Sequence, residues 1–213
     1  MSARDTRSRL VRHAARADIR IPGPLADRLT TYLDLLLRWN RKINLTALDN
    51  LDDAVDRLLL EPLVAARQVV ATTGRLIDLG SGGGSPAIPL ALALPELGLT
   101  MVEVKARKAA FLREAVRVLE LPRAVVETAR FEELLERQGQ RGGYTVLSVR
   151  AVKIELATLR RIAEFLRPEG LVLMFRGPSG PDRLPDALPL AWTGTHPLLE
   201  SLRSRLTLFR RVA

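Results

Sequence analysis

Apolar residues follow two different patterns, and the change falls near residue 70. Over residues 22–40 they recur at helical spacing, which predicts one amphipathic helix. A second helical stretch begins around Leu51, and Pro62 is expected to kink or break it. The arginine-rich residues 1–21 show little apolar periodicity, so we expect a mobile segment or a marginal helix there.

After residue 70, short apolar runs alternate with amphipathic stretches. The pattern predicts strands at 75–79, 99–104, 124–128, 144–149, 171–176 and 205–212, and helices at 86–94, 106–119, 131–137 and 155–166. Alternation of this kind is typical of an α/β fold with a mostly parallel sheet and helices on both faces. The proline-rich stretch that runs through Pro197 is assigned no strand.

A glycine-rich turn joins the first of these strands to the following helix. Gly80, Gly82 and Gly84 let the backbone bend sharply and approach a ligand, and the next helix directs N–H groups into the same crevice. Ser85 stands where the dinucleotide-binding fingerprint would need a glycine. The preceding Asp78 suits a cationic amino-acid ligand better than a pyrophosphate. The spacing instead resembles motif I of class I methyltransferases, which bind S-adenosylmethionine; a purely structural turn is the alternative.

Three charged residues stand where neighbouring strands end. Glu103 follows the second strand and is placed to bind ribose hydroxyls, Arg130 follows the third, and Arg150 follows the fourth. Ligands of open α/β sheets bind outside the carboxyl ends of the strands, so these side chains are expected to meet beside the glycine turn. Guanidinium groups can stack on a base and bind phosphate. For each residue taken alone, an ordinary solvated charge is the favoured alternative, and the common position at strand ends favours the binding role instead.

Composition narrows the possible partners and chemistry. The formal charge of +9, from 33 basic and 24 acidic residues, favours a polyanion, above all nucleic acid. The chain has no cysteine, and its two histidines, His13 and His196, lie at opposite ends, which disfavours a metal site or a catalytic triad. No apolar stretch is long enough to span a membrane. We expect a cytoplasmic monomer with neither metal nor membrane partner.

Five segments carry a more specific pattern. They read W-N-R-K-I-N-L-T at 39–46, G-S-G-G-G-S-P-A-I-P-L-A at 80–91, R-K-A-A-F-L at 107–112, A-R-F-E-E at 129–133 and S-V-R-A-V at 148–152. Together they resemble the RsmG/GidB family of bacterial 16S ribosomal RNA guanine-N7 methyltransferases. The resemblance covers roughly residues 33–177.

The resemblance implies a class I methyltransferase fold: a Rossmann-like, mostly parallel, seven-stranded twisted sheet over residues 71–213, after a basic helical extension over residues 1–70. It implies S-adenosylmethionine contacts at Gly80, Ser85, Phe131, Glu132 and Arg150, in addition to those expected at Asp78, Gly82, Gly84 and Glu103. The partner would be 16S ribosomal RNA or the small ribosomal subunit. Arg150 and Arg130 are the expected catalytic residues, and Lys105, Arg107, Asn40 and Asn44 the expected substrate-binding residues. Replacing Arg150 is expected to reduce turnover more than stability.

The chain also departs from the family pattern. Leu58 replaces a histidine, and Glu61-Pro62 stands where the family has Asp-Ser, so a methyltransferase with a shifted target stays open. Guanine N7 carries a free lone pair and needs no general base, which fits the lack of an apparent His, Cys or carboxylate base. A nicotinamide oxidoreductase, disfavoured by the missing third glycine, and a non-catalytic RNA- or ribosome-binding protein are the other hypotheses.

Overall fold

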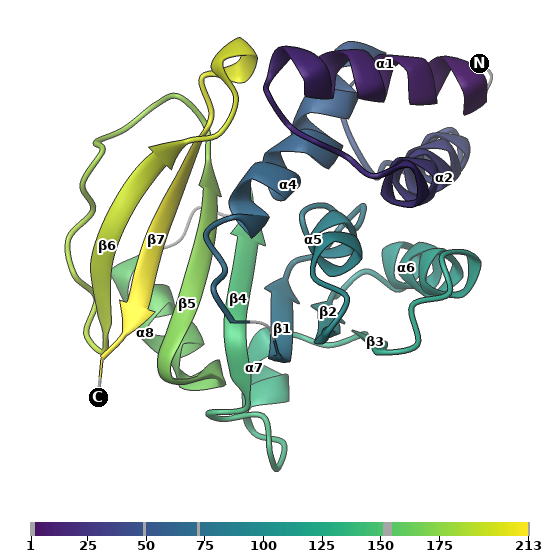
Figure 1. Ribbon diagram of the computed structural model, residues 1–213. Coiled ribbons are helices and arrows are strands. Elements are labelled where there is room, and N and C mark those ends of the chain that lie inside the picture. The colour runs from purple at the N-terminus through teal and green to yellow at the C-terminus, as the bar shows by residue number, and fades with distance from the viewer. Residues whose placement is uncertain (1–2, 49, 72, 151–154, 213) are drawn as a thin grey trace.

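Seven strands form one sheet, which confirms the expected α/β architecture (Figure 1). The computed structural model describes residues 3–48, 50–71, 73–150 and 155–212. The strands are β1 (Gly74–Leu79), β2 (Leu97–Val102), β3 (Ala124–Glu127), β4 (Tyr144–Arg150), β5 (Leu166–Arg176), β6 (Leu190–Pro197) and β7 (Arg205–Arg211). Their order is β3-β2-β1-β4-β5-β7-β6, and β7 runs antiparallel to both of its neighbours while β1 to β5 pair in parallel. The chain reverses its direction of travel across the sheet between β1 and β4, where a crevice is expected.

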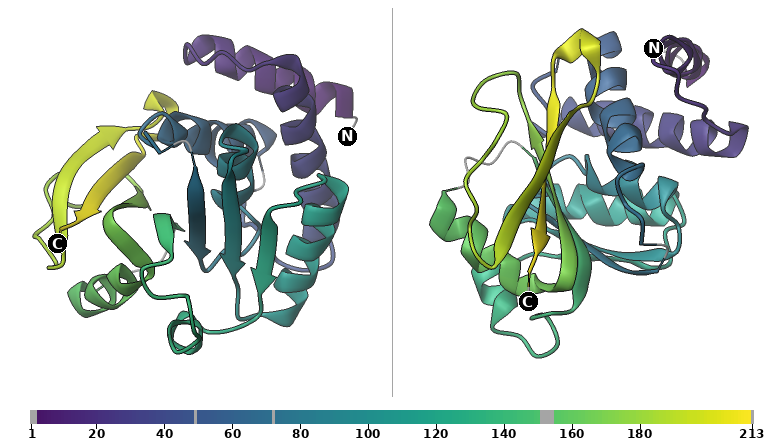
Figure 2. Two further views of the ribbon diagram at one scale, coloured as in Figure 1. Left: turned by 60° about the horizontal axis from the view of Figure 1, so that its bottom comes forward. Right: turned by 60° about the vertical axis from the view of Figure 1, so that its left-hand side comes forward.

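Helices cover both faces of this sheet (Figures 1 and 2). The α-helices are α1 (Ala3–Arg16), α2 (Gly23–Asn40), α3 (Leu51–Ala54), α4 (Glu61–Ala66), α5 (Ala87–Ala93), α6 (Ala106–Val118), α7 (Phe131–Leu135) and α8 (Leu156–Ile162). A π-helical stretch η1 (Val55–Leu60) joins α3 to α4, and short 3₁₀ turns are η2 (Ala163–Phe165) and η3 (Glu200–Leu202). Helices α7 and α8 lie on one face, and α5 and α6 lie on the other together with α1 to α4. No helix in the described ranges is long and apolar enough to cross a membrane.

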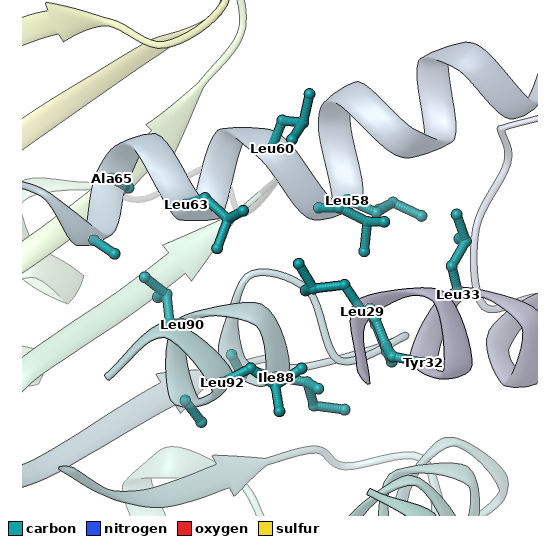
Figure 3. Close-up of a cluster of buried hydrophobic side chains, with 14 of the residues drawn as sticks. Leu29, Tyr32, Leu33, Leu58, Leu60, Leu63, Ala65, Ile88, Leu90 and Leu92 are labelled. Carbon is teal, nitrogen blue, oxygen red and sulfur yellow. The ribbon is translucent and has the colours of Figure 1, made fainter. Parts of the chain in front are cut away.

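Strand side chains divide between two hydrophobic clusters. On β1, Leu76 packs into the cluster with α2, α4 and α5, while Ile77 packs into the cluster with α7 and α8. On β5, Leu173 and Val172 divide in the same way. Successive strand residues point to opposite faces, and both faces are covered here, so the strands are apolar along most of their length. Figure 3 shows the first cluster where α2, η1–α4 and α5 meet.

The N-terminal segment forms helix α1, which is the helical one of the two alternatives expected for it, and this helix packs against the rest of the protein. Leu10 and Ala14, four residues apart, are buried against the rest of the protein, while the neighbouring arginines stay on the outer face. Arg7 pairs with Asp27 of α2 at 2.6 Å, and Arg9 pairs with Asp52 of α3 at 2.8 Å. The helix is fixed by packing, which weak local periodicity could not indicate.

Pro62 does not break the second helical stretch, which widens into a π turn instead. Proline has no N–H to donate, and the Glu61 N–H reaches back five residues to the Asp56 carbonyl. The Arg57 carbonyl therefore lacks a helical donor from either Glu61 or Pro62. The Leu58 carbonyl likewise receives nothing from Pro62, four residues on. The Leu58 carbonyl accepts a hydrogen bond from the Ser85 hydroxyl instead, and the Arg57 carbonyl accepts one from Arg150.

The sequence prediction missed strand β6 and placed some boundaries incorrectly. Prolines 189 and 197 and Gly194 interrupt the apolar pattern, and the pairing with β7 shifts between Trp192 and Gly194. Strand β6 is the sheet edge, where prolines are tolerated because one side of the strand has no partner. Strand β5 begins at Leu166, where the sequence predicted the end of a helix.

Candidate active site

The glycine turn after β1 is held in a fixed shape from two sides. Gly80 N–H and Ser81 N–H both donate to the Val102 carbonyl at the end of β2, at 2.9 and 3.0 Å. From the helical side, the buried Tyr32 hydroxyl of α2 donates to the Gly83 carbonyl at 2.6 Å. Gly80 has a φ of +73°, a left-handed conformation that favours glycine. The turn is thus pre-formed at the carboxyl end of β1.

Glu103, predicted to follow the second strand, lies directly against this turn. Its Oε2 accepts from Gly82 N–H at 2.9 Å and its Oε1 accepts from Lys105 N–H at 2.8 Å. The side chain is 7% exposed and also lines a hollow at the strand ends. These two backbone donors fix the orientation of the carboxylate, which suits it to accept hydrogen bonds from ribose hydroxyls.

Two hollows open on either side of Gly80. The first, about 230 Å³, is lined by Leu79, Gly80, Val102, Glu103, Val104, Ala129, Arg130, Phe131, Glu132, Val149, Thr158 and Ile162. The second, about 260 Å³, is lined by Leu36, Leu45, Thr46, Ala47, Leu48, Arg57, Leu58, Gly80, Ser81, Gly82, Gly83, Ser85 and Arg150. We call the first hollow the apolar slot, and it includes Glu103 in its lining. We call the second hollow the cradle, and it is lined by the glycine turn together with residues of α2, the loop after it and η1.

Most residues predicted for the site line one of these hollows. Arg130, Phe131 and Glu132 lie together in the apolar slot, where Arg130 precedes α7. Ser85 lies in the cradle, and its Oγ donates to the freed Leu58 carbonyl at 2.8 Å. Gly84 differs from its neighbours, because a Cβ there would meet Ile88 Cδ1 of α5 at 2.6 Å. Gly84 therefore serves the packing of the turn on α5.

The residues predicted to bind substrate are placed less uniformly. Lys105 and Arg107 are exposed at the start of α6, and Asn44 is exposed after α2. The Asn40 Oδ1 accepts from Leu45 N–H at 2.8 Å and from Thr46 N–H at 3.0 Å. Asn40 thus shapes the loop that lines the cradle through internal hydrogen bonds. Ala151 and Val152 of the last motif lie outside the described residues.

Arg150, at the end of β4, is the most extensively held of the predicted site residues. Its Nη1 donates to the freed Arg57 carbonyl at 2.6 Å and pairs with Glu61 Oε2 at 3.0 Å. Its guanidinium carbon lies 4.5 Å from the centre of the Phe175 ring. Burial lowers the pKa of Arg150, and the Glu61 carboxylate opposes that shift. An arginine stays charged in spite of such a shift, so the pair is ionic.

Comparison with known proteins agrees with this geometry. A family model described as GidB, rRNA small subunit methyltransferase G, matches residues 26–186. The ribosomal RNA small subunit methyltransferase G of Stenotrophomonas maltophilia strain K279a is 40% identical over 176 residues, which cover 83% of this chain and 80% of the relative. The protein of the same name from Ralstonia nicotianae is 37% identical over 196 residues, covering 88% of this chain and 85% of the relative.

The chain belongs to this family. It is therefore an S-adenosylmethionine-dependent methyltransferase, which decides against the nicotinamide oxidoreductase. Solved structures agree on the fold alone. A Klebsiella pneumoniae protein provisionally assigned as an O-methyltransferase aligns with a TM-score of 0.65 at 18% identity, over 95% of this chain and 96% of its own. A SAM-dependent methyltransferase from Aquifex aeolicus aligns with a TM-score of 0.58 at 11% identity, over 76% of this chain and 94% of its own.

Glu61 is the residue of interest that the sequence analysis did not select. It appeared only as a departure from the family pattern, together with Pro62. The structure places its buried carboxylate opposite Arg150, beside the cofactor region. The sequence signal that could have found it is a charged residue inside an otherwise apolar helix, next to a proline that disturbs the helical hydrogen bonds.

Asp78 lies beneath the glycine turn and is 1% exposed. Its Oδ1 accepts from the Ser148 hydroxyl at 2.6 Å, and burial raises the pKa of Asp78 to about 6. When the pKa of an acid is higher in the folded than in the unfolded protein, ionisation of that acid lowers the stability of the fold. Through this group, stability is greatest below the unfolded pKa and falls as pH rises to about 6.

Asp78→Asn is therefore expected to stabilise the cofactor-free protein at pH 7 by up to about 3 kcal/mol. The asparagine oxygen can still accept from Ser148, while the buried charge is removed. The affinity for a cationic cofactor should fall at the same time. Urea unfolding at pH 4.5 and 7, with calorimetric titration of S-adenosylmethionine, measures both effects. A variant that is less stable than wild type at pH 7 would contradict this account of Asp78.

Proposed function

We propose that this methyltransferase methylates N7 of a guanine in 16S ribosomal RNA of the small ribosomal subunit. The observation that carries the proposal is the pair of hollows beside the glycine turn, which Arg57, Arg130 and Arg150 line. The names of the relatives support small-subunit ribosomal RNA as the substrate. The net charge of +9 supports a polyanionic partner.

The residues present fit S-adenosylmethionine. The apolar slot suits the adenine ring, with Phe131 and Glu132 at its wall, and the oriented Glu103 carboxylate suits the ribose hydroxyls. The cradle between Gly80 and Ser85 suits the amino-acid portion, because Gly82 lines it and an added Cβ there would have only the Gly80 carbonyl oxygen nearby, at 3.7 Å. When bound, the cofactor supplies a methyl group on a positively charged sulfur.

For N7 methylation the protein mainly has to align the guanine N7 with the methyl group and the sulfur of the cofactor. The N7 lone pair forms the new bond to the methyl carbon while the carbon–sulfur bond breaks, and no proton has to leave. A crevice that fixes nucleophile, methyl group and sulfur in line supplies the main catalytic effect. Arg150, which lines the cradle, contributes by holding the base.

The exposed cations near the crevice form the proposed RNA path. Lys105 and Arg107 extend from the start of α6, and Arg130 stands at the mouth of the apolar slot. Such side chains bind phosphates without reading sequence, so affinity for RNA should decrease steeply with salt. Asn44, exposed after α2, is the remaining proposed contact.

The proposal is tested by transferring labelled methyl groups to small subunits and to free 16S ribosomal RNA that lack the modification. Cleavage chemistry specific for 7-methylguanine should then cut the RNA at a single position. Label on another base would mean a shifted target, and RNA binding with no label at all would favour a non-catalytic RNA-binding protein. Comparing the two substrates also tells whether RNA or the assembled subunit is preferred.

A further inference from the structure

A third hollow, about 240 Å³, continues from the cradle past the ends of β4 and β5. It is lined by Arg57, Glu61, Arg150, Phe175, Arg176, Gly177 and Ser204. Arg57 and Arg150 line this hollow and the cradle alike, so the two spaces adjoin at those side chains. Arg150 lines both hollows, whereas Glu61 lines the outer hollow and not the cradle.

Two residues that line this outer hollow, Glu61 and Arg150, have buried polar atoms without a hydrogen-bond partner. Glu61 is 3% exposed, and while its Oε2 pairs with Arg150, its Oε1 accepts no hydrogen bond. The Nε and Nη2 of Arg150 are likewise buried without an acceptor. Buried polar groups normally have partners, and an unsatisfied carboxylate oxygen is costly. A free acceptor on Glu61 and free donors on Arg150 together suit a ligand that has both a hydrogen-bond donor and a hydrogen-bond acceptor.

The order of the two groups selects among purines. Reading away from N7, guanine presents the O6 acceptor and then the N1–H donor, whereas adenine presents the N6 donor and then the N1 acceptor. With N7 toward the cofactor, the nearer protein group must donate to guanine and the farther one must accept. Arg150 and Glu61 stand in that order. With adenine, the N6 donor would face the Arg150 donors and the N1 acceptor would face the Glu61 carboxylate, so neither hydrogen bond could form.

On the basis of the proposed function, we propose that Glu61 is the residue that selects guanine. Its free Oε1 accepts from guanine N1–H, and Nη2 or Nε of Arg150 donates to O6. The Arg57 carbonyl and the Phe175 ring hold the guanidinium in place for this contact. As N7 becomes positively charged, N1–H becomes more acidic, so its bond to the carboxylate strengthens in the transition state.

Nucleotide preference of the wild-type chain tests this without any substitution. Binding of guanosine, inosine and adenosine monophosphates is measured by NMR titration of the protein saturated with S-adenosylhomocysteine. Inosine keeps O6 and N1–H, so it should bind within about threefold of guanosine, and adenosine should bind at least about tenfold more weakly. Equal or stronger binding of adenosine monophosphate would overturn the selection by Glu61.

Glu61→Gln then assigns the preference to one side chain. Arg150 Nη1 requires an acceptor, so it should keep the amide oxygen and leave the NH₂ group facing the hollow. We expect kcat/KM for small subunits to fall about 100-fold, and the preference for guanosine over adenosine monophosphate to disappear. The calorimetric affinity for S-adenosylmethionine should stay within twofold of wild type, which also reports that the variant folds.

Glu200→Gln is the matched control, because Glu200 is exposed on η3 and the substitution changes the same charge. It should leave turnover and nucleotide preference unchanged. An unchanged preference in folded Glu61→Gln would contradict the role of Glu61 even if methyl transfer to guanine N7 is observed. A wild type that prefers guanosine monophosphate but methylates no ribosomal RNA would instead contradict the proposed function and leave base selection standing.

Discussion

Arg150→Met is expected to remove about 3–5 kcal/mol of folding stability together with nearly all methyl transfer. The substitution leaves the Glu61 carboxylate, 3% exposed, without its counter-ion, and a buried charge left unpaired is strongly destabilising. It also removes the donor to the Arg57 carbonyl. The sequence predicted a larger effect on turnover than on stability, whereas the structure makes both large. Urea unfolding and methyl transfer to small subunits measure the two effects.

The double variant Glu61→Met/Arg150→Met separates stability from function. With both charges replaced by apolar side chains of similar length, most of the lost stability should return, because two apolar residues can replace a buried ion pair at little cost. Methyl transfer should stay abolished, since neither group can contact the base. The single variant Glu61→Met completes the comparison, and a double variant that loses as much stability as Arg150→Met and Glu61→Met added together would mean that the pair contributes nothing as a pair.

Gly84→Ala is expected to destabilise the protein by about 2–5 kcal/mol. Gly84 has a φ of +86°, and an added Cβ would lie 2.6 Å from Ile88 Cδ1 and 3.2 Å from Leu112 Cδ2. The left-handed backbone contributes about 1–2 kcal/mol of this loss, and the overpacking about 1–3 kcal/mol. Thermal or urea unfolding of the cofactor-free protein measures the loss.

Gly82→Ala is the matched control for that substitution. Gly82 also has a left-handed φ, of +52°, but the nearest atom to an added Cβ is the Gly80 carbonyl oxygen at 3.7 Å. Its stability should fall by only about 1–2 kcal/mol, from the backbone alone. Its affinity for S-adenosylmethionine should nevertheless fall about tenfold or more, because the methyl group enters the cradle. Equal destabilisation by the two substitutions would contradict the separate roles of these glycines.

The sequence predicted well what depends on local pattern. Five of the six expected strands overlap their observed counterparts closely, because apolar runs covered on both faces stand out in the sequence. The glycine turn and Glu103 were identified from spacing alone, and they lie against each other in the structure. Residues at the ends of parallel strands meet at one edge, so topology converts their sequence positions into a common site.

What the sequence could not predict depends on contacts between distant segments. The Tyr32 hydroxyl donates a hydrogen bond to Gly83, 51 residues away in the glycine turn, and the apolar periodicity of the sequence does not predict that bond. Helix α1 is stabilised by burial of Leu10 against the rest of the fold, which its own pattern barely indicates. Pro62 was expected to kink or break a helix; the helix continues through a π turn, and the missing N–H frees carbonyls that accept hydrogen bonds from Ser85 and Arg150. The importance of Glu61 becomes apparent only after that rearrangement.

The central claim is methylation of one guanine in 16S ribosomal RNA, and mass mapping of that RNA in a strain lacking the gene tests it most directly. One guanine-containing fragment should lose the mass of a single methyl group, and the 7-methylguanine cleavage at that position should disappear. The wild-type gene should restore both signals, and the gene encoding the Glu61→Met/Arg150→Met protein should restore neither. A methylation pattern of 16S ribosomal RNA that is identical with and without the gene would contradict the account.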